Sequence, residues 1–352
     1  MRRFPIALLL TFVLSACGGG GGNTTSLPSL SSGGAAPSNG GAAVLPLPKF
    51  YTVVDLGAFV QPAAINNRNT VAGTVFRGDS TNAFIYRNGK LVSFPAQSHA
   101  VAINDNDVAV GDDWQYMPDG SEQSLGSVNS AVALQALGID DDGHIFGLAF
   151  QAGVAGCNGA LTLLSASAPP NVIGGQSSTL VVSRSGKVVL DGYSQTGNGC
   201  TGTIQPFYYP GNAPVPLPSD LTLDVNTSLL SGVNDAGDVV GYSQQNGTGK
   251  IVTFFAHHGI ATEIAPPAGY QFFEAAAVNN ADWIVGNESN QKTVQAFVWV
   301  NGTITNLNTR LSASCSQWVL QTATGVNDAG YIVGVGTLNG ASHGYLLVPS
   351  ST

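Results

Sequence analysis

Acidic residues, a histidine and two tryptophans supply the side chains that could perform acid–base chemistry or bind a ligand in this 352-residue chain. Paired carboxyl groups can donate and accept protons, and together with exposed aromatic rings they could bind a carbohydrate or a cation. The candidates in segments expected to form loops are His99, Asp112, Asp113, Trp114, Asp220, Asp224, Glu274, Glu288 and Trp318. They could equally be ordinary solvated loop residues, so none is assigned a catalytic role.

Two histidine-containing segments invite a metal interpretation. The run from Asp140 to His144 lacks the alternating acids and distal glutamate of an EF-hand, so we expect a solvated turn. His257 and His258 are adjacent on an expected strand, where successive side chains face opposite sides, so both are not expected to bind one metal. No GxSxG, HExxH or P-loop motif is present. We therefore expect no metal and no cofactor.

The composition argues against a nucleic-acid partner. Lysine and arginine total 12 against 21 aspartates and glutamates, which gives a net charge of −9, and no basic cluster stands out. Without such a cluster the chain cannot displace the counterions of phosphates. Hydrophobic residues make up 43% of the chain and charged residues 9%, which also separates it from charged disordered proteins.

One short pattern recurs along the chain and determines the predicted fold. Each copy carries Asn, Asp or Ser near its start and continues into a valine- or isoleucine-rich segment, which ends at Gly in every copy except the degenerate one at 182–189. The copies occupy residues 64–73, 102–111, 138–147, 182–189, 232–241, 277–286 and 325–334. Their spacing of roughly 36 to 51 residues lies in the range of propeller blades.

Each copy predicts a β-hairpin. The first polar residue can bond to the backbone two residues later, which initiates a turn. Three residues after it, the position requires a positive φ, which Gly, Asn and Asp tolerate. That position holds Asn69, Asp107, Gly143, Gly186, Gly237, Asp282 and Gly330. The glycine that closes the following strand indicates a close backbone approach.

A third and a fourth strand follow each hairpin. Aromatic segments such as residues 83–89 and 296–302 end in Asn-Gly, a signal for a two-residue hairpin turn. Six units then have four strands, whereas the last unit stops after three. Residues 51–57 form a strand that precedes the first unit and supplies the missing one. The sequence predicts an all-β, seven-bladed propeller closed by its N-terminal strand, with small residues of the first strands near the axis.

In this propeller the first-to-second and third-to-fourth turns lie on one face. The second-to-third and fourth-to-first connections, expected to be longer and variable, lie on the opposite face. The candidate ligand-binding residues named above belong to these connections. We therefore expect any ligand to bind on that opposite face.

The repeats resemble those of the bacterial extracellular HAF repeat family. Residues 233–241 and 326–334 match its I-N-x-x-G-x-V-V-G core. The family's His-Ala-Phe triplet is only partly kept, as Ala83-Phe84, Ala296-Phe297 and His343. The resemblance covers about residues 51–348 and implies a propeller-like fold and export. It implies no catalytic residues.

The N-terminal segment indicates export and lipid attachment. Arg2 and Arg3 precede a short apolar stretch, which is too short to span a membrane, and residues 14–17 resemble the lipobox of bacterial lipoproteins. The resemblance implies cleavage after residue 16 and lipidation of Cys17, and Gly18 implies the outer membrane. We expect residues 1–16 to be a signal peptide, 17–48 a disordered tether rich in Gly, Ser and Pro, and 49–349 a single propeller domain.

The remaining cysteines are expected to serve structure. Cys157 and Cys200 occupy comparable loop positions in neighbouring units, and exported proteins favour disulfides, so we expect these two to pair. Cys315 is then left over and is expected to be a buried, unreactive thiol.

Fold alone does not determine function. The sequence favours a monomeric, noncatalytic binding module at the bacterial cell envelope, attached to the membrane by lipid, with a protein or a glycan as its ligand. The alternative is a glycan-acting lyase or hydrolase whose site lies on the same face.

Overall fold

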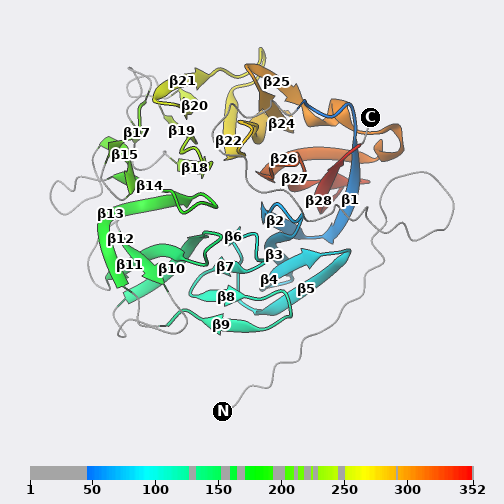
Figure 1. Ribbon diagram of the computed structural model, residues 1–352. Helices are drawn as coiled ribbons and strands as arrows, with labels where there is room; N and C mark the ends of the chain where they lie inside the picture. The colour runs from blue at the N-terminus through cyan, green and yellow to red at the C-terminus, as the bar shows by residue number, and fades with distance from the viewer. Residues whose placement is uncertain are drawn as a thin grey trace.

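The computed structural model describes residues 46–126, 132–151, 159–164, 171–192, 203–209, 213–217, 223–224, 229–244, 250–290 and 292–350. In these residues antiparallel strands form a ring of seven blades around a central axis (Figure 1). Two short 3-10 helices, η1 (Leu307–Arg310) and η2 (Ala313–Cys315), are inserted before the last blade. The described residues include no helix with the length and hydrophobicity needed to cross a membrane.

The chain passes through blades 1, 2 and 3 in order, from the innermost strand of each blade outward. Blade 1 consists of β2 (Val60–Ile65), β3 (Val71–Arg77), β4 (Ser80–Arg87) and β5 (Lys90–Ala96). Blade 2 consists of β6 (Ala102–Ile103), β7 (Ala109–Gly111), β8 (Trp114–Tyr116) and β9 (Glu122–Ser124). Blade 3 begins with β10 (Val132–Ile139), β11 (Ile145–Gln151) and β12 (Gly159–Leu164).

Blades 3 and 4 share one long strand, β13 (Asn171–Val182), whose first part pairs with β12 and whose second part pairs with β14. Blade 4 continues with β14 (Val188–Gly192), β15 (Thr203–Tyr209) and β16 (Ala213–Pro214), and β17 (Leu223–Asp224) also pairs with β15. Blade 5 consists of β18 (Leu229–Val233), β19 (Val239–Gln244), β20 (Ile251–His257) and β21 (Ile260–Ile264). Blade 6 consists of β22 (Phe272–Val278), β23 (Ile284–Ser289), β24 (Val294–Val300) and β25 (Thr303–Asn306).

Both ends of the chain contribute to blade 7, as the sequence predicts. Its inner strands are β26 (Trp318–Val326), β27 (Ile332–Leu338) and β28 (Ala341–Pro349). The outer strand is β1 (Tyr51–Ala58), which pairs antiparallel with β28 so that Val53 faces Leu347 and Val54 faces Leu346. The backbone hydrogen bonds of this strand pair therefore close the ring.

The two faces of the ring differ from the prediction in one respect. We call the face with the first-to-second and third-to-fourth turns the belt face, and the opposite one the loop face. The second-to-third connections of blades 1, 2 and 7 have two residues each, at 78–79, 112–113 and 339–340, so the expected longer connections are absent there. Phe59 alone joins β1 to β2.

The first-to-second turns have the predicted conformation. Each of the seven positions expected to need a positive φ has one, from +58° at Asp282 to +92° at Gly237. The side-chain oxygen that starts each turn also accepts the backbone N–H four residues later, as Asn66 does from Thr70 and Asn327 does from Tyr331. These local bonds explain why the turn could be recognised from sequence alone.

The closing glycines permit the predicted close approach. In blades 6 and 7, a Cβ placed on Gly286 or Gly334 would lie 1.9 Å from the carbonyl oxygen of Glu274 or Thr322, respectively. In the first strand of each of these blades a bulge lies near that carbonyl, between Ala275 and Ala277 in blade 6. Any larger residue would force the two innermost strands apart.

Turns of adjacent blades are joined by asparagine side chains. The Asn327 amide donates to the Asn66 carbonyl at 2.9 Å, and the Asn66 amide donates to the Asn104 carbonyl at 2.8 Å. The same bond joins blades 2 to 3, 5 to 6 and 6 to 7. At the equivalent position blades 3 and 4 have Asp140 and Ser183, which have no amide to donate.

The next residue of each turn forms a second ring of bonds. Its backbone N–H donates to the side chain of the corresponding residue in the following blade, as from Asn67 to Asp105 at 2.8 Å. The bond recurs around the ring and returns from Asp328 to Asn67, with two departures: Asp141 donates to the Arg184 carbonyl, and in blade 4 the donor to Asp235 is Ser185. We call these two rings the belt; its residues are 66–67, 104–105, 140–141, 183–185, 234–235, 279–280 and 327–328.

Hydrophobic side chains fill the spaces between blades. Seven clusters of buried side chains occur in the described residues, one at each junction between neighbouring blades. Between blades 5 and 6, Phe273 stacks on Phe297 with ring centroids 4.0 Å apart. Apolar contact supplies the attraction between blades, and the belt sets their relative position.

Replacing Asn327 by aspartate tests the belt. Asn327→Asp keeps an oxygen for the Tyr331 N–H but removes the N–H donors that bond to the Asn66 carbonyl and to Asn69. We expect the free energy of unfolding, measured by chemical denaturation, to fall by about 1–3 kcal/mol, because buried acceptors lose their donors. Asn339→Asp, in a two-residue turn on the loop face, is the control. Equal losses in both variants would contradict a special role for the belt amides.

Candidate functional site

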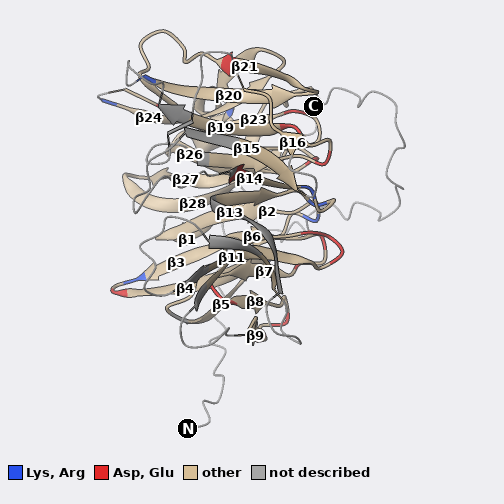
Figure 2. Ribbon diagram, turned by 90° about the vertical axis from the view of Figure 1, so that its left-hand side faces the viewer, with Lys and Arg blue, Asp and Glu red and all other residues tan. Residues whose placement is uncertain are grey.

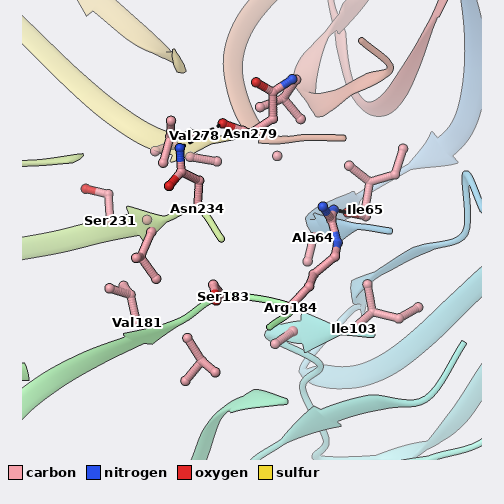
Figure 3. Close-up of a pocket in the computed structure, with 18 of the residues that line it drawn as sticks. Ala64, Ile65, Ile103, Val181, Ser183, Arg184, Ser231, Asn234, Val278 and Asn279 are labelled. Carbon is pink, nitrogen blue, oxygen red and sulfur yellow. Dashed lines mark hydrogen bonds between the residues drawn. The ribbon is translucent and has the colours of Figure 1, made fainter. Parts of the chain in front are cut away.

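A cavity of about 230 Å³ lies at the centre of the ring. The innermost strands of all seven blades line it, and Figure 3 shows side chains converging on it from several directions. Many of the lining residues are small, as the sequence predicts for the axis: Ala63, Ala64, Ala102, Ser231, Gly232, Ala276, Ala277, Thr324 and Gly325. A cavity of this size and lining could accept a small group but offers few polar contacts along its length.

Arg184 crosses the mouth of this cavity on the belt face (Figure 3). Its guanidinium donates to the Ile65 carbonyl at 3.1 Å and lies 3.4 Å from Asp328 and 3.7 Å from Asp105. Arg184 belongs to blade 4, whereas its partners belong to blades 1, 2 and 7. The side chain is 18% exposed, so its contacts are partly shielded from water.

Four aspartates surround the mouth, and each belongs to the belt: Asp105, Asp141, Asp235 and Asp328. Burial raises the pKa of Asp141, and the neighbouring carboxylates of Asp105 and Asp235 add to this effect. Burial also raises the pKa of Asp235, but hydrogen bonds from Asn280 and Ser185 outweigh it and hold the pKa below its usual value. These carboxylates outnumber the single guanidinium, so the mouth is acidic. Figure 2 shows acidic residues gathered along one face of the ring.

Two of the predicted ligand-binding residues meet on the loop face. Nδ1 of His99 lies 3.2 Å from Oδ2 of Asp112, which also accepts the backbone N–H of His99 at 2.9 Å. Both side chains are nearly half exposed. Asp113 follows in the same connection, and Trp114 starts β8 and packs partly against the cluster between blades 1 and 2. The pair could contact a ligand from solvent.

Three other predicted loop residues lie inside strands, which corrects the sequence interpretation. Trp318 is 5% exposed and packs edge-to-face against Tyr345. Glu274 lies in β22 and accepts a bond from Asn287, and Glu288 lies in β23. These strands extend beyond the small-residue segments from which their bounds were predicted. Asp220 lies outside the described residues, and of Asp224 only its place in β17 is described.

Glu288 is the most unusual of these acids. It is 3% exposed, and its Oε2 atom has no hydrogen-bond partner. Burial raises the pKa of its carboxyl group. The side chain is not part of the central cavity lining. It is therefore a buried carboxyl group with a raised pKa, and it does not reach a ligand in that cavity.

Sequence reasoning missed the apolar residues of the loop face. Seven large hydrophobic side chains of the described chain are exposed, and four lie on this face: Phe59, Phe272, Val294 and Val319. Val101 instead lines the central cavity. The four lie on blades 6 and 7 and at the junction between blades 7 and 1, which are consecutive around the ring. Phe59 is 64% exposed and has a φ of +59°, which is strained for an aromatic residue. The sequence offered one signal of this exposure: Phe59 follows the predicted N-terminal strand directly, in the connection to the first blade.

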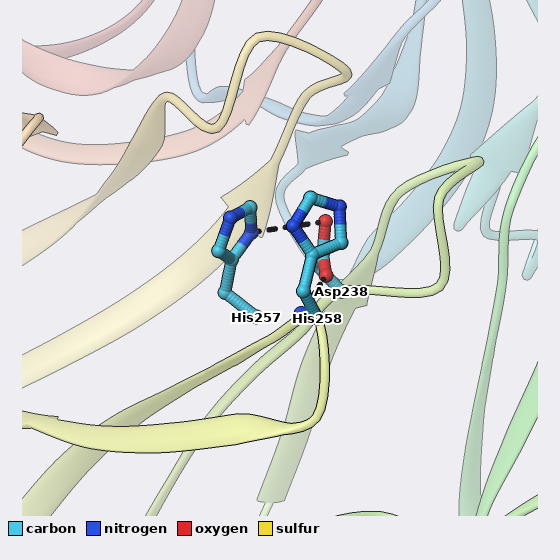
Figure 4. Close-up of side chains that lie close together, drawn as sticks. All are labelled: Asp238, His257 and His258. Carbon is cyan, nitrogen blue, oxygen red and sulfur yellow. Dashed lines mark hydrogen bonds and ion pairs between the residues drawn. The ribbon is translucent and has the colours of Figure 1, made fainter. Parts of the chain in front are cut away.

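The two adjacent histidines behave differently from the prediction. His257 ends β20, but His258 has a φ of +48° and starts the turn to β21, so strand alternation does not apply to it. The two rings consequently lie on the same side, with centroids 3.9 Å apart, next to Asp238 (Figure 4). Another group, Asp140, Asp142 and His144, also has ligand atoms close together. Here Nδ1 of His144 is hydrogen-bonded to Asp140 at 2.9 Å.

The cysteine predictions need one correction. Cys315 is fully buried, as expected, but it is disulfide-bonded and is not a free thiol. A pairing between distant segments leaves no local sequence pattern, which explains the error. Cys17, Cys157 and Cys200 lie outside the described residues. The chain has 4 cysteines, so lipidation of Cys17 and a Cys157–Cys200 bridge cannot both accompany the bond to Cys315.

The chain is similar to β-propellers of known structure. An oligogalacturonate lyase in complex with manganese is 12% identical, with 86% of this chain and 94% of that chain covered and a TM-score of 0.58. The β-propeller domain of the Trilobed protease from Pyrococcus furiosus, described as having an open velcro topology, is 8% identical over 83% and 96%, with a TM-score of 0.53. A puromycin-hydrolysing peptidase from Mycobacterium tuberculosis is 11% identical over 84% and 52%, also at 0.53.

This chain is a seven-bladed β-propeller. Identities of 8 to 12% show the shared fold and nothing finer about activity. No protein-family model matches the sequence, and no curated protein matches it. Unlike the open arrangement described for the Pyrococcus domain, the last blade of this propeller is completed by β1.

Glu288 should make the stability of the propeller depend on pH. Because burial raises its pKa in the folded state, the native protein holds this proton more tightly than the unfolded chain does. Stability is therefore lost as pH rises from the unfolded pKa, about 4.3, through the folded one. We expect Glu288→Gln to raise the Tm at about pH 7 and to have little effect near pH 3.5.

The matched control is Glu274→Gln, since Glu274 lies in the neighbouring strand, is half-buried and accepts a bond from Asn287. Thermal unfolding followed by circular dichroism at both pH values measures the difference. A Glu288→Gln variant that is less stable than the parent protein at pH 7 would contradict a carboxyl group whose ionisation is opposed by burial.

Proposed function

We propose that this protein is an exported, lipid-anchored β-propeller that acts as a noncatalytic binding module at the bacterial cell envelope, with the loop face as its contact surface. The observation that carries the proposal is the concentration of exposed Phe and Val side chains on that face. Exposed apolar groups gathered on one face mark interaction surfaces, and aromatic residues contribute most to them. The resemblance to HAF repeat proteins supports the extracellular part of the proposal.

The belt face is less suited to binding through these residues. Its backbone N–H groups and carboxylates already bond from one turn to the next, as between Asn280 and Asp328. A ligand that bound to them would have to replace intramolecular bonds. On the loop face, by contrast, Phe59 and Phe272 are 64% and 47% exposed and have apolar surface to bury.

The ionisable groups support binding over catalysis. His99 and Asp112 form the one predicted pair that meets in the described structure, and both are open to solvent. Catalytic acids and bases usually lie in desolvated clefts that shift their pKa values. Glu288 is desolvated but does not line the central cavity. A glycan-acting enzyme remains the alternative function.

The position of β1 also favours the loop face as the contact surface. β1 begins at Tyr51 on the belt face, where its first residues pair with the end of β28. A tether that precedes it would leave the ring on that side. Anchoring through Cys17 would then place the loop face away from the attachment point, where a partner could reach it.

Anchoring through Cys17 can be tested directly. We expect the parent protein to be recovered with the membrane fraction and Cys17→Ser to be recovered in the soluble fraction, because acyl chains supply the attachment. Peptide mapping without reduction should join Cys315 to Cys157 or Cys200. A mature protein in which Cys315 is bonded to Cys17 would overturn the anchor, because that sulfur could not also carry a lipid.

Phe59 offers the sharpest test of the contact surface. Phe59→Gly removes the exposed ring and also relieves the positive φ, so the Tm should stay unchanged or rise. The purified propeller, immobilised and exposed to solubilised envelope, should retain a specific protein or glycan. We expect Phe59→Gly combined with Phe272→Ser to reduce this retention at least tenfold.

Ile260→Ser is the matched control, because Ile260 is 68% exposed but lies on the belt face. It should retain the ligand as the parent protein does. Equal retention by the loop-face variant and the control would overturn the contact surface. Cleavage of a polysaccharide by the parent protein would favour the enzymatic alternative.

A further inference from the structure

We propose that His257, His258 and Asp238 form a zinc site on the belt face of blade 5. This inference is independent of the proposed function. The three residues lie at two turns of the same blade: His257 ends β20, His258 starts the turn to β21, and Asp238 directly precedes β19. Figure 4 shows both imidazole rings beside the Asp238 carboxylate. Each residue offers one ligand atom, and these three atoms all lie within 4.8 Å of one another.

The distances suit a tetrahedral ion. Zinc bonds to histidine nitrogen and carboxylate oxygen are about 2.0–2.2 Å long, so two ligand atoms at the tetrahedral angle lie roughly 3.3–3.5 Å apart. Nδ1 of His257 lies 3.3 Å from Oδ2 of Asp238. A ligand atom of His258 lies within 4.8 Å of both, so the three residues could supply three ligands and leave a fourth position open.

One buried polar atom at this site lacks a hydrogen-bond partner, and the buried carboxylate beside it has no lysine or arginine partner in the described residues. Nδ1 of His257 is buried and makes no hydrogen bond, although Asp238 is nearby. Asp238 has 4% of its side chain exposed, and His257 is its only ion-pair partner in the described part of the chain. A desolvated carboxylate without lysine or arginine, next to an unbonded imidazole nitrogen, is an arrangement that a shared cation would stabilise.

Neighbouring groups hold the carboxylates in place. The Asn234 amide donates to Asp238 at 3.1 Å and to Asp282 at 3.0 Å, and the backbone N–H of His258 donates to Asp238 at 2.8 Å. Such outer contacts orient metal ligands in known sites. Asp282, from blade 6, lies 3.6 Å from Nδ1 of His257 and adds negative charge beside the site.

The donor set selects the class of metal. Two imidazoles with one carboxylate suit zinc and similar transition metals, whereas calcium and magnesium prefer oxygen ligands alone. The group around His144 supplies only one imidazole, whose Nδ1 is already bonded to Asp140. A bound zinc would join both turns of blade 5 close to blade 6 and would stabilise the folded chain by mass action.

Zinc titration of the untagged full chain, treated with chelator and kept oxidised, tests the proposal. We expect one zinc ion per chain by calorimetry, an increase in Tm with added zinc, and visible absorption typical of tetrahedral coordination when cobalt(II) replaces zinc. His257→Gln combined with His258→Asn should weaken zinc binding at least tenfold and abolish the shift in Tm. Asn is chosen at position 258 because it tolerates the positive φ of the turn.

His144→Gln is the matched control and should bind zinc as the parent protein does. Circular dichroism of the metal-free variants establishes that each is folded, so that lost binding is not lost structure. Equal zinc affinity in the parent protein and the His257/His258 variant would overturn the proposal. So would the absence of binding to the parent protein at micromolar zinc.

Discussion

A buried amide must find hydrogen-bond partners on both its oxygen and its nitrogen, and this requirement joins the blades of the propeller. The oxygen of Asn66 fixes its own turn by accepting from Thr70, while its nitrogen donates to the carbonyl of Asn104 in the next blade. One side chain thus determines a local bend and a contact between blades. Aspartate or serine can do only the first, which explains why asparagine dominates this position of the repeat.

The local half of this arrangement was predictable, because a turn depends on residues within five positions of one another. The positive φ at Asn69 and Gly330 and the pairing of the two chain ends in blade 7 both follow from sequence. The predicted site was less accurate. Trp318 enters the core because β26 extends far enough to pair it with Leu338, and that register depends on the strand alongside it.

Side-chain direction was hardest to predict where a strand ends. His257 and His258 would face opposite sides in a continuing strand, but one residue with positive φ at the turn brings their rings together. The exposed apolar side chains of the loop face escaped prediction for a related reason. Phe59 looks like a core residue in sequence, and only the closure of the ring leaves it between β1 and β2 with nowhere to be buried.

Arg184 shows how the ring compensates where the belt is weakest. Blades 3 and 4 lack the amides that join the other turns, since Asp140 and Ser183 replace asparagine. Arg184 stands beside this gap and is the one basic residue in the described lining of the central cavity; its guanidinium reaches Ile65, Asp105 and Asp328 across the axis. A guanidinium has five N–H donors on a long side chain, so it can replace short neighbour-to-neighbour bonds by contacts across the ring. The charge that the mouth presents to solvent is therefore a consequence of how the blades are held together.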